Sequence, residues 1–195
     1  MKILHIDNLR FGHTVYTFLT IDSTQNKALE LARQGEKEGV VVSAQIQTAG
    51  RGRHNEVWVS EKGGLYFSII YRPKIVLSEV IGLTKLIGQS VKKTIERVLG
   101  QKYINTELKI KGINDIYFNN RKLAGILIET ESHIQGESCN PHFYIIGIGI
   151  NVNQKHFPRR YESIATSLRI ETDRKFSRYQ LLKLICENLS NILPS

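Results

Sequence analysis

Residues 47–53 read Gln47-Thr48-Ala49-Gly50-Arg51-Gly52-Arg53 and lie between two runs that predict strands, residues 40–42 and 65–71. Two glycines give this segment a permissive backbone, and its two arginines carry guanidinium groups that pair with phosphate or carboxylate oxygens. We interpret it as an anion-binding loop between two strands. A solvated basic loop or an RNA-binding Arg-Gly patch is the alternative.

The chain's single tryptophan, Trp58, follows this loop closely and favours a small-molecule ligand. An indole beside cationic side chains is a natural platform for a flat ring such as adenine. The loop and Trp58 together therefore predict a nucleotide-binding function.

Outside the loop, strands and helices alternate irregularly, and we expect one domain over residues 1–195. Amphipathic or capped helices are predicted at residues 25–32, 78–99 and 177–193, and strands at residues 1–6, 108–110, 116–118, 122–131 and 142–153. Asn119 and Asn120 suit the tight turn of a hairpin, whereas residues 111–115 form a polar insert. The pattern predicts an α+β fold, a mixed sheet backed by helices.

The chain has 27 Lys and Arg against 18 Asp and Glu, a net charge of +9, which favours an anionic partner. We find no recognisable nucleic-acid module and no window near the roughly 20 apolar residues of a membrane span. The two cysteines, Cys139 and Cys186, lack metal-ligand spacing, and the N-terminus has no signal-like segment. These features predict a cytoplasmic protein.

Several polar groups are candidates for the same site as the arginine loop. Ser23, Thr24 and Gln25 begin a predicted helix, whose free N–H groups bind either a ligand or simply a capping side chain. Lysines, amides and one carboxylate come from residues 111–115, from Lys122 and from the end of the 142–153 strand. That set suits acyl-adenylate chemistry, in which cations neutralise charge growing on the phosphate of ATP, with Mg²⁺ held by Asp115.

At these residues the sequence resembles the biotin protein ligases. The matching motifs are Asp22-Ser23-Thr24-Gln25, residues 47–53 with Trp58, Asn114-Asp115, Arg121-Lys122-Leu123-Ala124-Gly125-Ile126-Leu127 and Gly147-Ile148-Gly149-Ile150-Asn151-Val152-Asn153. The resemblance implies a class II synthetase-like catalytic domain that makes biotinyl-5′-AMP from biotin and ATP. It further implies transfer of biotin to a lysine of the biotin carboxyl carrier protein of acetyl-CoA carboxylase.

The resemblance also implies a role for each site residue. Ser23, Thr24, Gln25 and Gln47 would surround the ureido ring, and Gly50, Arg51, Gly52 and Arg53 would form the loop that covers biotin and the adenylate. Lys122 would face the biotin carboxylate and the α-phosphate, Lys111 would add positive charge, and Asn114 and Asp115 would serve phosphate and magnesium. Trp58 and Asn151 would flank the adenine. Lys122, Arg53 and Lys111 are the expected catalytic residues.

The sequence departs from the family pattern in several places. Gly112-Ile113 replaces the usual Trp-Pro, and His54-Asn55-Glu56 replaces basic or glycine residues, so we expect weaker adenylate binding. We expect neither the small C-terminal β-barrel nor the N-terminal DNA-binding domain of many relatives.

Three other interpretations stay open. A lipoate or octanoate ligase shares the chemistry, but its own arginine and glycine signature is absent from this sequence. A catalytically weak biotin- or nucleotide-binding module is supported by the lost Trp-Pro pair. A nucleic-acid binder would use the arginine loop and the net charge. Homodimer formation is also left open.

Overall fold

The structure is a computed structural model that describes residues 1–75, 77–103, 108–130 and 142–194. Its strands are β1 (Lys2–His5), β2 (Thr14–Ile21), β3 (Val41–Gln47), β4 (Leu65–Tyr71), β5 (Leu108–Lys111), β6 (Asp115–Phe118), β7 (Arg121–Thr130) and β8 (Tyr144–Ile150). Its α-helices are α1 (Thr24–Arg33), α2 (Val80–Leu99), α3 (Leu168–Thr172) and α4 (Arg178–Ile192). Short 3-10 turns lie at Arg53–Asn55, Leu77–Glu79, Gln101–Tyr103 and Arg159–Tyr161.

The strands form one 8-stranded sheet in the order β1-β2-β3-β4-β8-β7-β6-β5. Among these neighbours only β2 and β3 are parallel, and α1 is the crossover that a parallel connection requires. The remaining pairs are antiparallel. The α+β prediction, with a mixed sheet backed by helices, is therefore confirmed.

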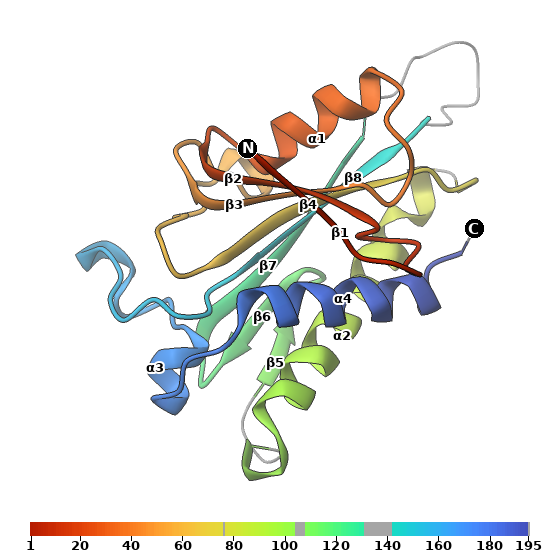
Figure 1. Cartoon of the computed structure of the whole chain (residues 1–195). Helices are drawn as coiled ribbons and strands as arrows, with labels where there is room; N and C mark the ends of the chain where they lie inside the picture. The colour runs from red at the N-terminus through yellow and green to blue at the C-terminus, as the bar shows by residue number, and fades with distance from the viewer. Residues whose placement is uncertain (76, 104–107, 131–141, 195) are drawn as a thin grey trace.

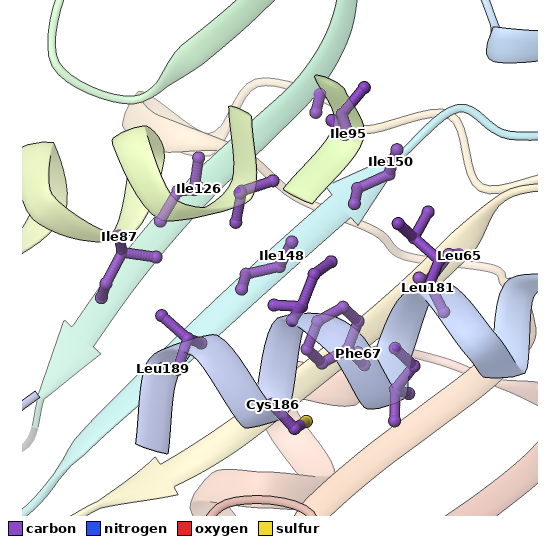
Figure 2. Close-up of a cluster of buried hydrophobic side chains, with 14 of the residues drawn as sticks. Leu65, Phe67, Ile87, Ile95, Ile126, Ile148, Ile150, Leu181, Cys186 and Leu189 are labelled. Atoms are coloured by element: carbon purple, nitrogen blue, oxygen red, sulfur yellow. The ribbon is translucent and has the colours of Figure 1, made fainter. Parts of the chain in front are cut away.

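Helices α2 and α4 pack against one face of the sheet and bury the larger core (Figure 1). Figure 2 shows this core, in which side chains of β4, β7 and β8 meet both helices: Leu65, Phe67, Ile126, Ile148 and Ile150 from the strands, and Ile87, Ile95, Leu181, Cys186 and Leu189 from the helices. Burying this apolar surface stabilises the fold in proportion to its area.

Helix α1 covers the opposite face with a smaller core that includes Ala28, Val42, Ile70 and Ile145. Successive side chains of a strand point to opposite faces, so Gly147 and Gly149 lie on the same face as Ile145. Beyond the N-terminus of α1, this face therefore presents glycines in place of bulky side chains, and a binding site is formed there.

Most predicted elements are present, and their boundaries shift by a few residues. Strand β4 has the predicted bounds, and the hairpin turn between β6 and β7 has φ of 47° at Asn119 and 63° at Asn120. The polar insert at residues 111–115 is the turn of a second hairpin, since Lys111 pairs with Asp115 across β5 and β6. The sequence analysis does not predict strand β2 or helix α3.

Cys139 lies outside the described residues.

None of the helices in the described ranges is both long enough and apolar enough to cross a membrane.

Candidate active site

A cavity of about 560 Å³ opens on the α1 face of the sheet, a size typical of small-molecule sites. It lies between the N-terminus of α1, the segment of residues 47–60, and strands β6, β7 and β8. The predicted site residues that line it are Ser23, Thr24, Gln25, Gln47, Arg51, Gly52, Arg53, Trp58, Asn114, Asp115, Lys122 and Asn151. Segments far apart in the sequence thus meet in one cavity.

The arginine segment is an irregular hairpin that continues β3. Backbone bridges join Gln47 to Ser60 and Arg51 to Val57, and the Trp58 N–H donates to the Gly50 carbonyl at 2.9 Å. Within this segment the positive φ occurs at His54 (54°) and not at Gly50 or Gly52.

Gly50 does not line the cavity and serves a packing role. A Cβ atom there would lie 2.5 Å from Ser60 Oγ and 2.6 Å from the Trp58 carbonyl oxygen, so only glycine fits. Gly52 has room for a side chain, because a Cβ atom there would meet nothing closer than 3.7 Å.

Glycines of β7 and β8 form the floor of the cavity. A Cβ atom at Gly147 would lie 2.7 Å from Gln25 Oε1, and one at Gly149 would lie 2.6 Å from the Trp58 indole nitrogen. Gly125 also faces Trp58, at 3.1 Å. The side chains of Gln25 and Trp58 therefore lie directly on the backbone of the sheet.

One end of the cavity holds a network of hydroxyl and amide groups around the start of α1. Ser23 caps the helix by accepting from the Gln25 N–H, as predicted for this position. Thr24 donates from its backbone N–H at 2.8 Å and its hydroxyl at 3.0 Å to Gln47 Oε1, and its hydroxyl accepts from Ser68. The network fixes these side chains relative to one another.

The same end includes a carboxylate that we had not predicted. Arg51 donates from Nε at 3.0 Å and Nη2 at 2.8 Å to the two oxygens of Glu129, and from Nη1 at 2.6 Å to Asn26. Gln25 Nε2 donates to the Glu129 Oε2 atom at 2.8 Å. The first arginine of the loop is therefore paired within the protein, whereas Arg53 is exposed at the mouth.

The other end holds the predicted lysine and carboxylate. Lys122 Nζ lies 2.8 Å from Asp115 Oδ2 and 5.4 Å from the centre of the Trp58 ring. Asn114 is buried and donates to the Ile126 carbonyl at 3.1 Å. A cation, a carboxylate, an amide and an indole thus converge here.

Four buried polar atoms lack a hydrogen-bond partner among the described residues, and each belongs to a residue that lines the cavity: Gln25 Oε1, Trp58 Nε1, Asn114 Oδ1 and Asp115 Oδ1. Buried polar atoms are almost always hydrogen-bonded, because leaving one unsatisfied costs about 1 to 3 kcal/mol. Their concentration in one cavity indicates a polar ligand.

Two predicted residues differ from expectation in their surroundings. Lys111 does not line the cavity, and its Nζ lies 4.4 Å above the ring of Tyr117, which does. Asn151 lines the cavity, but its amide donates to the Lys122 carbonyl at 3.4 Å and accepts from Gln154 at 3.1 Å. Lys111 thus contacts the lining residue Tyr117, and the side-chain amide of Asn151 is hydrogen-bonded within the protein.

The segment after β8 supplies an apolar wall that sequence reasoning missed. Phe157, Tyr161, Ile164 and Ala165 line the cavity near Lys122. The Lys122 N–H donates to the Ile164 carbonyl at 2.7 Å, which ties this wall to the start of β7. No periodicity marks such an irregular segment, so only its place in the fold reveals it.

The backbone conformation of Gly112 accounts for the glycine that stands here in place of the family's usual tryptophan. Its φ of 64° is left-handed, so glycine is suited to this turn of the β5–β6 hairpin. We expected Gly112 to leave the segment loose, but the glycine fits a tight turn between paired residues.

The family model of the biotin/lipoate A/B protein ligase family matches residues 18–151. This range contains every predicted site residue, and it is more than half of the 195-residue chain. The chain therefore belongs to the biotin/lipoate A/B protein ligase family.

Individual proteins that are similar to this chain are named as ligases. The bifunctional ligase/repressor BirA of Bacillus spizizenii is 42% identical over 191 residues, which are 91% of this chain and 56% of that protein. A biotin protein ligase from Aquifex aeolicus, solved with biotin and ATP, has a TM-score of 0.73 and 31% identity, over 91% of this chain and 68% of that one. A Leishmania major biotin protein ligase with biotinyl-5-AMP has a TM-score of 0.72 and 25% identity, over 91% and 74%. The chain thus spans little more than half the length of its Bacillus relative.

Proposed function

We propose that this protein is an ATP-dependent biotin protein ligase that makes biotinyl-5′-AMP and transfers biotin to a lysine of a biotin carboxyl carrier protein. One observation carries the proposal: a single cavity has hydroxyl and amide groups at one end and the Lys122–Asp115 pair at the other. Such a cavity suits a ligand with a polar head group and a carboxylate. The names of the relatives, which include biotin ligases solved with biotin, ATP and biotinyl-5-AMP, support the same reading.

The first step joins the acid to the nucleotide. A biotin carboxylate oxygen attacks the α-phosphorus of ATP, the bond from that phosphorus to the β-phosphate oxygen breaks, and pyrophosphate leaves. Lys122 lines the cavity beside Asp115, and in this step its ammonium group would meet the negative charge that grows on the phosphoryl oxygens; a fixed cation in a desolvated site lowers that barrier. Trp58 and the apolar wall at Ile164 supply flat and apolar surface for the adenine.

The second step transfers the acyl group. The neutral amine of the acceptor lysine attacks the carbonyl carbon of biotinyl-5′-AMP, an amide forms, and AMP leaves with the bonding electron pair. Arg53 at the mouth covers the intermediate and keeps water from it.

The residues present also fit a magnesium ion. Asp115 Oδ1 and Asn114 Oδ1 are buried, belong to residues that line the cavity and lack partners among the described residues. Mg²⁺ prefers oxygen ligands and is usually held by one or two carboxylates together with phosphates. Asp115 would hold the ion, which would neutralise phosphate charge.

We further propose a cytoplasmic location and leave homodimer formation open. A lipoate or octanoate ligase is the second candidate, since the family includes such enzymes. The polar end of the cavity favours biotin, because those fatty acids have no polar head group. A catalytically weak binding module is the third candidate.

The deciding experiment measures pyrophosphate release from ATP with biotin, lipoate or octanoate as the acid. Release that depends on biotin supports the proposal. Release only with lipoate or octanoate identifies the second candidate, and binding of biotin without release identifies the third.

A further inference from the structure

We propose that Glu129 is a positioning residue that sets the preference for the head group of the acid, acting through Gln25. This inference rests on the proposed function. Glu129 does not line the cavity, yet its carboxylate contacts two residues that do, Arg51 and Gln25.

The carboxylate fixes the orientation of the Gln25 amide. An ionised carboxylate only accepts hydrogen bonds, so the Gln25 nitrogen must face it, and this contact is 2.8 Å long. The reversed amide would place two acceptor oxygens against each other. The Ile145 carbonyl, 3.4 Å from the same nitrogen, is also an acceptor and reinforces the choice.

The consequence is a buried acceptor without a partner, on a residue that lines the cavity. Gln25 is 5% exposed, and its Oε1 atom lies over Gly147 without a partner among the described residues. Its neighbours Thr24, Gln47 and Ser68 are already bonded to each other. A head group that presents an N–H therefore satisfies Gln25, whereas a hydrocarbon or dithiolane leaves a buried oxygen unpaired.

The ureido N–H of biotin has this chemistry, and lipoate and octanoate lack it. Sites built around a hydrogen bond reject ligands that cannot form it more strongly than apolar pockets reject small changes of shape. Glu129 and Gln25 together would thus select a cyclic urea over other acids of the family.

Arg51 shares the same carboxylate, so the test must separate two effects of Glu129. In Glu129→Gln the new amide can donate to Gln25, which frees the Gln25 amide to turn, and the charge that pairs with Arg51 is also lost. The experiment therefore compares Glu129→Gln in the wild-type background and in a Gln25→Leu background, which has no amide to orient. Biotin and ATP affinities are measured by calorimetry, with melting temperature as the folding control.

The expected result is a loss of about tenfold or more in biotin affinity for Glu129→Gln, and less than about twofold for the same change in the Gln25→Leu background. The KM for biotin rises while kcat and ATP affinity stay unchanged, because the Lys122 end is untouched. Glu129→Asp, which keeps an acceptor-only group, is expected to retain most of the affinity.

Equal losses in both backgrounds, or no loss in either, would overturn the inference. If Glu129→Gln does not fold, Glu129→Asp and Gln25→Leu decide it: affinity must survive the first change and fall about tenfold in the second. A wild-type protein that binds no biotin would refute the proposed function instead, so the two failures are distinguishable.

Discussion

The Nζ atom of Lys122 lies 2.8 Å from Asp115 Oδ2, at the end of the cavity opposite Gln25. This ion pair holds the ammonium group in place beside the Trp58 ring. In the proposed reaction, the carboxylate and the phosphate would meet a cation that is already oriented, which is the preorganisation that electrostatic catalysis requires.

We therefore predict that Lys122→Ala folds but forms little adenylate. Loss of one group that stabilises charge in the transition state costs about 3 kcal/mol, or roughly a hundredfold in rate. Biotin-dependent pyrophosphate release measures this, and a wild-type rate in the mutant would contradict the role given to Lys122.

Arg53→Ala should affect retention of the intermediate more than its formation. An open mouth still lets the adenylate form but exposes it to water. The expected signs are free biotinyl-AMP in the medium and labelling of bystander lysines. Gly52→Ala is the matched control, because a methyl group there meets no close atom.

Gly50→Ala should disturb the arginine segment although the added group is small. The methyl would lie 2.6 Å from the Trp58 carbonyl oxygen, and backbone cannot move aside cheaply. We expect a loss of about 1 to 3 kcal/mol in unfolding free energy, or an equivalent loss of biotin affinity if the segment shifts instead. Urea unfolding and calorimetry distinguish these outcomes, and Gly52→Ala should match wild type in unfolding free energy.

Restoring the family's Trp-Pro pair at Gly112 and Ile113 should not tighten ATP binding. The left-handed φ of Gly112 strains any side chain, by about 1 kcal/mol or more for tryptophan. Gly112→Asn should be tolerated better than Gly112→Val, since asparagine adopts this conformation more readily. Melting temperatures and ATP dissociation constants give the comparison, and a tighter double mutant would show that the turn can adopt another conformation.

Cys186 should be inert to alkylation in the folded protein. Burial raises the pKa of its thiol to about 12, and the side chain is fully buried between α4 and the sheet (Figure 2). In a Cys139→Ser background, iodoacetamide should modify Cys186 only at the rate of unfolding.

The same thiol affects stability at alkaline pH. The unfolded thiol ionises near pH 9.0 but the folded one only near 12, so unfolding releases a proton between these values and stability falls as pH rises. Cys186→Ala should lose this part of the pH dependence in urea unfolding experiments, and an unchanged dependence would contradict the burial argument.

The sequence predicted the elements whose side chains repeat regularly, such as β4 and α2, because core packing imposes that repeat. Strand β2 was missed because only Val15 within it is buried, while Leu19 is 74% exposed, so its pattern does not alternate clearly. Motif spacing located Lys122 and Gln25, but not Glu129. The proposed role of Glu129 depends on its contact with Gln25, which lies 104 residues away in the sequence. A local sequence pattern does not reveal such a contact.

Strand β7 carries Lys122 near its beginning and Glu129 near its end. Lys122 and Glu129 are seven positions apart, and the pairing with β6 has a bulge between them, so they are separated by at most roughly 23 Å along a strand that is hydrogen-bonded on both sides. In the proposed complex, this fixed separation would hold Gln25, which Glu129 orients, at a set distance from Lys122, which would meet the carboxylate. An acid with one methylene more or fewer in its tail would then bind at the head and bring its carboxylate to the wrong place, so the backbone of β7 would set the length of acid that the proposed site accepts.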